Sequence, residues 1–92
     1  MTIENSPIIL TQSYLEKGIF SFVRLIHTVD IFQNTDVFSV FMTSKSAETQ
    51  TEDFIYDISR ERDEAEKFFR MLCEQKATAS SLQSLAEAFV DC

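Results

Sequence analysis

A single histidine, His27, limits the catalytic chemistry open to this chain. A Ser-His-Asp or Cys-His arrangement would have to use it as the base. His27 lies in an apolar run between Ile26 and Val29, and no glycine follows any serine to form a nucleophile elbow. We therefore interpret His27 as a structural or surface residue, and we predict that the protein is not an enzyme.

A run of acidic residues is the next candidate, because closely spaced carboxylates can hold a metal ion. Its members are Glu61, Asp63, Glu64 and Glu66. Bases at i,i+4 spacing predict the ion pairs Asp63–Lys67 and Glu66–Arg70 on a solvated helix face. The H-E-x-x-H, EF-hand and C-x-x-C spacings are absent from the sequence. We therefore expect neither a metal nor another cofactor.

The charge balance disfavours anionic partners. The formal net charge is −7, and most of the acids lie in residues 47–92. Such a chain should repel phosphate backbones and anionic lipid, and Arg24 and Lys45 are too few bases for a nucleic-acid surface. A phosphate loop would also need more glycine than Gly18. No stretch approaches the ~20 apolar residues that span a bilayer. We expect no nucleic acid and no membrane partner, whereas the acidic surface could engage an unidentified basic protein.

Aromatic residues are dense, with nine phenylalanines in 92 residues. The candidates for an interface or pocket are Phe20, Phe22, Arg24, His27, Phe38, Phe41, Phe54 and Tyr56. One interpretation is a hydrophobic core that continues into an interface between two copies of the chain. The alternative is a small-molecule-binding or sensory domain, whose phenylalanine-lined pocket takes polar groups from Arg24, His27 or Tyr56.

The first half of the chain must position these residues on strands. The predicted strands are Ile8–Leu15, Ile19 to about Val29, Val37–Thr43 and Glu52–Ile58. Gly18 suits the first turn because glycine readily adopts positive φ. The second strand exceeds the usual length, so we expect a bend or bulge near Arg24 or His27. The polar residues Ser44–Thr51 predict a loop, which we expect to be the most mobile segment.

The second half shows helical periodicity. Apolar residues recur first at Ala65, Phe68, Phe69, Leu72 and Cys73, and then at Leu82, Leu85, Ala86, Phe89 and Val90. Ser59 is the predicted N-cap of a helix that runs to about Lys76. A second helix is expected to start at Thr78 or Ser80, since Ser80 and Gln83 fit a capping box.

These elements predict an α+β fold in one domain, 1–92, with a sheet part over 8–58 and a two-helix part over 59–91. Short connections favour an antiparallel meander of about four strands followed by two C-terminal helices packed on one face. The second strand is apolar on both faces, with Val23 and Leu25 on one and Phe20 and Phe22 on the other. Helices can cover one face only, so strong sheet curvature, the N-terminal segment or another chain must cover the rest. Of these we expect a second copy of the chain, in a homodimer.

The cysteines and the N-terminal sequence indicate the compartment. Two cysteines, Cys73 and Cys92, are too few for a disulfide framework, so we expect free thiols. The apolar run Ile8–Leu10 is too short for a signal peptide and is not preceded by positive charge. We expect a cytoplasmic protein.

Three short motifs carry a family resemblance. They are Gly18-Ile19, Asp57-Ile58-Ser59 and the closing Leu85-Ala86-Glu87-Ala88-Phe89-Val90. On these motifs the chain, from about Ile8 to Val90, resembles a family of short bacterial proteins known only as a domain of unknown function. The resemblance implies a bacterial cytosolic protein and brings no activity, cofactor or catalytic residue. The long second strand and the Ser44–Glu52 segment depart from the family pattern.

Overall fold

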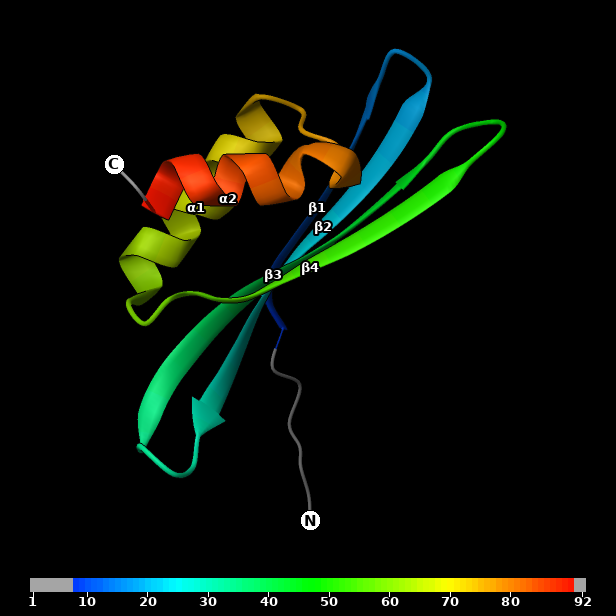
Figure 1. Cartoon of the computed structure of the whole chain (residues 1–92). Coiled ribbons are helices and arrows are strands. Elements are labelled where there is room, and N and C mark those ends of the chain that lie inside the picture. Colours follow the sequence, from blue (N-terminus) through cyan, green and yellow to red (C-terminus); the bar gives the residue numbers. More distant parts are fainter. Residues whose placement is uncertain (1–7, 91–92) are drawn as a thin grey trace.

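The computed structural model describes residues 8–90, which form one antiparallel sheet and a helical layer. The elements in chain order are β1 (Ile8–Glu16), β2 (Ile19–Asp30), β3 (Thr35–Lys45), β4 (Gln50–Ser59), α1 (Arg62–Glu74), the 3₁₀ helix η1 (Ala79–Ser81) and α2 (Leu82–Val90). The strand order is β1-β2-β3-β4, and both helices lie on the same face of the sheet (Figure 1). The predicted α+β meander with two C-terminal helices is confirmed.

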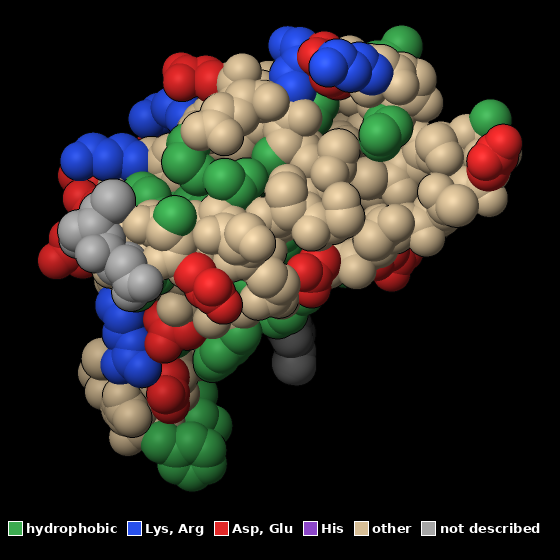
Figure 2. Space-filling model, turned by 45° about the horizontal axis from the view of Figure 1, so that its top comes forward, with side chains coloured by type: hydrophobic (Ala, Val, Ile, Leu, Met, Phe, Trp, Pro, Cys, Tyr) green, Lys and Arg blue, Asp and Glu red, His purple; other side chains and the backbone are tan. Residues whose placement is uncertain are grey.

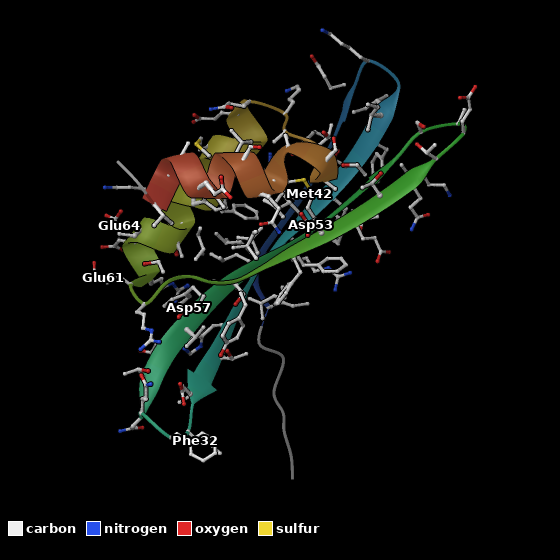
Figure 3. All side chains as sticks on the ribbon, viewed as in Figure 1. Phe32, Met42, Asp53, Asp57, Glu61 and Glu64 are labelled. Carbon is white, nitrogen blue, oxygen red and sulfur yellow. The ribbon has the colours of Figure 1, made fainter. Side chains whose placement is uncertain are left out.

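Two tight turns shape the ends of β2. Lys17 and Gly18 join β1 to β2 with φ of 54° and 79°, the paired positive φ of a two-residue hairpin. At the other end, Asp30 Oδ1 accepts hydrogen bonds from the backbone N–H of Phe32 at 3.0 Å and of Gln33 at 3.2 Å. This second turn lies at the tip of the β2–β3 hairpin, where Figure 3 shows Phe32 far from the helices.

The hydrophobic core lies between the sheet and the helices. Its fully buried side chains include Val23, Leu25, Val40 and Met42 from the strands and Phe68, Leu72 and Leu82 from the helical layer. Val23 is paired with Met42 and Leu25 with Val40 across β2 and β3, so these four side chains share one face. The apolar stripes that predicted the helices are therefore the stripes that cover this face.

Buried polar contacts fix the helical layer on the sheet. The Tyr14 hydroxyl of β1 donates to the carbonyl of Ala77 at 2.6 Å, just after α1. Ser44 Oγ accepts the backbone N–H of Ala79 at 2.8 Å and lies 2.8 Å from Ser21 Oγ. Burial raises the pKa of Tyr14 to about 12, with a further contribution from Cys73. These contacts satisfy groups that the helix–sheet interface removes from water.

The N-terminal ends of α1 and of the second helical segment differ from the predictions in two respects. Ser59 is not the N-cap of α1, because it still belongs to β4, where it pairs with Phe38. Glu61 occupies the N-cap position, and its backbone N–H donates to Ser59 Oγ. The second helical segment has Thr78 as its N-cap, which agrees with one of the two predicted starts. The capping box, however, joins Thr78 to Ser81 rather than Ser80 to Gln83.

The irregularities of the sheet lie elsewhere than predicted. β2 pairs with β3 without a register shift from Phe20 to Asp30. The shifts fall instead in β1, between Ile8 and Leu10, and between β3 and β4, where Asp57 has a φ of 60°. β1 and β4 are edge strands, which accept an extra residue more easily than a strand paired on both sides.

Half of the segment Ser44–Thr51 is strand, and the other half is the predicted loop. β3 continues to Lys45 and β4 starts at Gln50, so residues 46–49 form the turn. Ser46 holds this turn, since its backbone N–H donates to the carbonyl of Thr49 at 2.8 Å. Of the polar side chains that suggested a longer loop, Ser44 is buried against Ser21 and the Ala79 N–H, whereas Gln50 and Thr51 are exposed at the start of β4.

The ion pairs on α1 differ from the prediction in one partner. They are Arg62–Glu66 at 2.9 Å, Glu66–Arg70 at 3.2 Å and Glu64–Lys67 at 3.3 Å. The predicted Glu66–Arg70 pair is confirmed, whereas Lys67 reaches Glu64 at i,i+3 rather than Asp63. Hydrogen bonding and charge from Arg62, with the charge of Arg70, hold the pKa of Glu66 below its usual range. The acidic run is thus a surface helix face.

Among residues 8–90, no helix is both long enough and apolar enough to cross a membrane.

Candidate functional site: the open face of the sheet

Among residues 8–90, both helices lie on the same face of the sheet (Figure 1), and we call the opposite face the open face. It is formed by the strand residues whose side chains alternate with those of the core. Its aromatic and charged members include Phe20, Phe22, Arg24, Phe41, Lys45, Glu52, Phe54 and Tyr56, joined by Leu15 from β1. Six of the eight residues predicted for an interface or pocket therefore lie together on this face.

Arg24 lies at the centre of the open face, between two aromatic rings. Its guanidinium carbon is 5.1 Å from the ring centroid of Phe22 and 5.2 Å from that of Phe41. Arg24 Nε is buried, with no hydrogen-bond partner among the described residues. The rings supply cation–π attraction, which keeps the positive charge close to the surface of the sheet.

Large apolar side chains around Arg24 remain in contact with water. Leu15 is 65% exposed, Phe20 50%, Phe54 44% and Tyr56 62%. The rings of Phe54 and Tyr56 lie 6.5 Å apart, in a tilted arrangement. A soluble monomer gains nothing from ordering aromatic side chains in water, so a continuous surface of this kind is typical of a contact site.

The charge of the open face differs from the charge of the rest of the chain. Its register positions hold the bases Arg24 and Lys45 and two acids, Glu52 and, at the end of β2, Asp30. The chain as a whole carries −7. Most of the acids lie elsewhere, and Figure 2 shows Asp and Glu side chains scattered over the side of the molecule that it views, with Lys and Arg side chains among them.

His27 and Phe38, the other two predicted site residues, lie on the helix-covered face. Their rings stack with centroids 4.9 Å apart, and Phe38 is buried in the core. His27 Nε2 lies 2.9 Å from Asp36 Oδ1. His27 and Arg24 are three residues apart on one strand, so their side chains point to opposite faces and do not converge on one cavity.

The sequence reasoning missed two groups of exposed residues. Leu15 belongs to the open face, which its position opposite Phe20 could have indicated. Ile31 and Phe32 lie in the β2–β3 turn and are 80% and 94% exposed. The sequence could have indicated this exposed tip, because the apolar pair Ile31-Phe32 directly follows Asp30, a residue type that caps turns.

Three hollows on the described surface do not involve the phenylalanines. One lies between β4 and α2, one is lined by hydroxyl side chains beside the β3–β4 turn, and one lies between β1 and α1. Residues 8–90 contain no group of three or more His, Cys, Asp or Glu side chains placed to hold a metal ion. Cys73 is a free thiol whose pKa is raised by burial and by Glu74, and Cys92 lies outside the described residues.

Comparison with known proteins adds no relative. Neither the models of protein families, nor the curated proteins, nor the solved structures contain a significant match to this chain. The resemblance on the three short motifs therefore stays a prediction, and the argument about function rests on the geometry above.

Proposed function

We propose that this protein is a small non-enzymatic interaction module that associates with a second copy of itself through the open face. The observation that carries the proposal is the group of half-exposed apolar side chains around Arg24, on a sheet whose other face is already covered. Two such sheets packed face to face, with the helices outside, form a four-layer dimer. The interface is isologous, since each copy contributes the same surface.

The size of the open face is sufficient for a modest dimer. Four strands spaced by ~4.8 Å, each presenting about eight residues at ~3.3 Å, give a flat footprint of roughly 500 Å² per copy. Two footprints, on the order of 1,000 Å², reach the lower limit for a specific interface. We therefore expect reversible association in the micromolar range rather than an obligate dimer.

The charge pattern favours a second copy as the occupant. Two chains of −7 repel each other through most orientations, but on the open face the acids Asp30 and Glu52 are balanced by the bases Arg24 and Lys45. Face-to-face contact therefore keeps most of the acids of both copies on the outside. Because the remaining long-range repulsion is screened by salt, association should strengthen as ionic strength rises.

Native mass spectrometry and sedimentation under reducing conditions test the proposal. The wild type should show twice the chain mass at micromolar concentration. Phe20→Asp places a charge in the open face and should give a monomer. Phe32→Asp makes the same chemical change at a side chain that is more exposed, 94% against 50%, and should stay dimeric.

Two results would contradict self-association through the open face. If the wild type is monomeric at micromolar concentration, the proposed dimer does not form. Equal disruption by Phe32→Asp and Phe20→Asp would mean that exposure of any apolar side chain drives the association. Circular dichroism of each variant establishes that the fold is retained.

A further inference from the structure

A groove on the helical side of the sheet lies between β4 and α2. It has a volume of about 330 Å³, and Ile55, Ile58, Ala86 and Val90 form its apolar wall. Asp57, Gln83 and Glu87 form its polar rim. The volume is at the lower end of the range for ligand sites, ~300–1,000 Å³, and the groove is open to solvent rather than enclosed, which suits a segment of chain better than a buried small molecule.

β4 gives this groove a backbone edge. It is the last strand of the sheet, and no strand among residues 8–90 pairs with its outer side. Its side chains are apolar towards both faces, with Ile55 in the groove and Phe54 and Tyr56 on the open face. An added strand would gain main-chain hydrogen bonds and place alternate side chains against apolar surface, as in β-strand addition.

The charge of this edge selects the kind of chain that can be added. β4 carries Glu52, Asp53 and Asp57, and Glu87 faces the groove from α2. Asp57 is paired with Arg60 at 3.2 Å, and Asp53 accepts from Gln83 Nε2 at 3.2 Å. Figure 3 shows Asp53 and Asp57 along β4, with Glu61 further on at the start of α1.

A second copy of β4 is a poor occupant, because its acids would meet the acids of the first. Like charges placed opposite each other on paired strands are destabilising. β1, the other edge, carries no charge from Ile8 to Leu15. The two edges of the sheet therefore differ, and the acidic edge excludes its own copy while it attracts basic residues.

We infer that the β4–α2 groove binds an extended, unstructured segment of another protein that combines apolar side chains with lysine or arginine. The backbone of this segment adds to β4, its apolar side chains enter the wall of the groove, and its bases meet Asp53 and Glu87. This site lies on the helical side of the sheet and does not depend on self-association through the open face.

Three fluorescein-labelled synthetic peptides of equal length test the inference with the full chain. In all three, serine occupies every second position, so that the positions between the serines face the groove together. These positions alternate lysine with valine in the first peptide, lysine with serine in the second and glutamate with valine in the third. The lysine–valine peptide should bind about tenfold more tightly than either of the others, because it alone satisfies both the charge and the apolar wall. In nuclear magnetic resonance spectra, its addition should shift the methyl signals of Ile55, Ile58 and Val90.

Exposed residues allow variants that keep the fold. Glu87→Lys should weaken the lysine–valine peptide about tenfold, since it reverses a charge at the rim. Val90→Ser should weaken it severalfold without any change in charge, because Val90 is 61% exposed and lines the wall. Glu16→Lys, an equal charge change at the far end of β1, is the matched control and should bind as the wild type does.

The inference is overturned if the lysine–serine peptide binds as tightly as the lysine–valine peptide, which would indicate attraction to net charge only. Equal weakening by Glu16→Lys and Glu87→Lys would overturn it as well. The Phe20→Asp variant separates the two proposals. If this variant is monomeric and still binds the lysine–valine peptide, peptide binding in the groove does not require the dimer.

Discussion

The two faces of the sheet are both apolar, yet they are built from different side chains. The helix-covered face is mainly aliphatic, with Val23, Leu25, Val40 and Met42 fully buried beside the aromatic rings of Tyr14 and Phe38. The open face uses aromatic rings around a cationic side chain, and several of these remain about half exposed. Aliphatic side chains pack tightly against helices, whereas rings and arginine are the residue types enriched in interfaces between proteins. The difference supports the proposal that one face serves folding and the other serves contact.

The sharpest test of this difference is a pair of identical substitutions, one on each side of the sheet. Leu72→Ala in α1 should lower the free energy of unfolding by about 2–5 kcal/mol, because Leu72 is fully buried against the sheet. Leu15→Ala on the open face should cost less than about 0.5 kcal/mol. Urea denaturation of dilute, monomeric protein measures both. Equal losses would mean that the open face is as tightly packed as the core.

A second pair of substitutions compares serines. Ser44→Ala removes the acceptor of the Ala79 backbone N–H and the partner of Ser21. A buried donor is then left unpaired, which should cost about 1–3 kcal/mol. Ser13→Ala, on the exposed side of β1, should be close to neutral in the same urea titration. A neutral Ser44→Ala would show that the 3₁₀ helix is not held to the sheet by this contact.

The two tyrosines form a third pair. Tyr14→Phe removes the hydrogen bond to the carbonyl of Ala77 and should cost about 1 kcal/mol. Tyr56→Phe, at a hydroxyl on the open face, should leave the stability of the monomer unchanged. Thermal unfolding followed by circular dichroism is sufficient for this comparison, and a larger effect at Tyr56 would contradict it.

The smallest expected effect is that of alkaline pH on the free energy of unfolding, and it is specific to Tyr14. The pKa of Tyr14 is raised from 10.0 to about 12 by burial, so the folded state keeps the phenol proton longer than the unfolded state. The contribution of Tyr14 is complete below pH 10.0 and is lost as pH rises towards about 12, since the unfolded state then binds fewer protons. The stability of the wild type should therefore fall more steeply over this range than that of Tyr14→Phe. Parallel curves would contradict the burial of this hydroxyl.

The sequence predicted the fold well because its two periodicities are clear. The apolar spacing of Phe68 and Leu72 marked α1, and Gly18 marked the first hairpin. The ends of the elements were harder to predict. Ser59 has the chemistry of an N-cap, but strand pairing with Phe38 outweighed it. Local propensity does not include such tertiary contacts.

The candidate site could be predicted only in part. Strand alternation places Phe20, Phe22 and Arg24 on one face, and the structure agrees. His27 and Phe38 were grouped with them by composition, although their register puts them on the other face. The groove between β4 and α2 could not be foreseen, because it depends on where α2 crosses the sheet.

The central claim is that the open face is the surface through which two copies meet. Isotope-filtered nuclear Overhauser spectroscopy on a mixture of labelled and unlabelled protein detects contacts between copies directly. If two copies meet through the open face, we expect cross-copy contacts from the Leu15 methyls to the rings of Phe20 and Phe54. Cross-copy contacts confined to Ile31 and Phe32 at the hairpin tip, or to the helices, would contradict it.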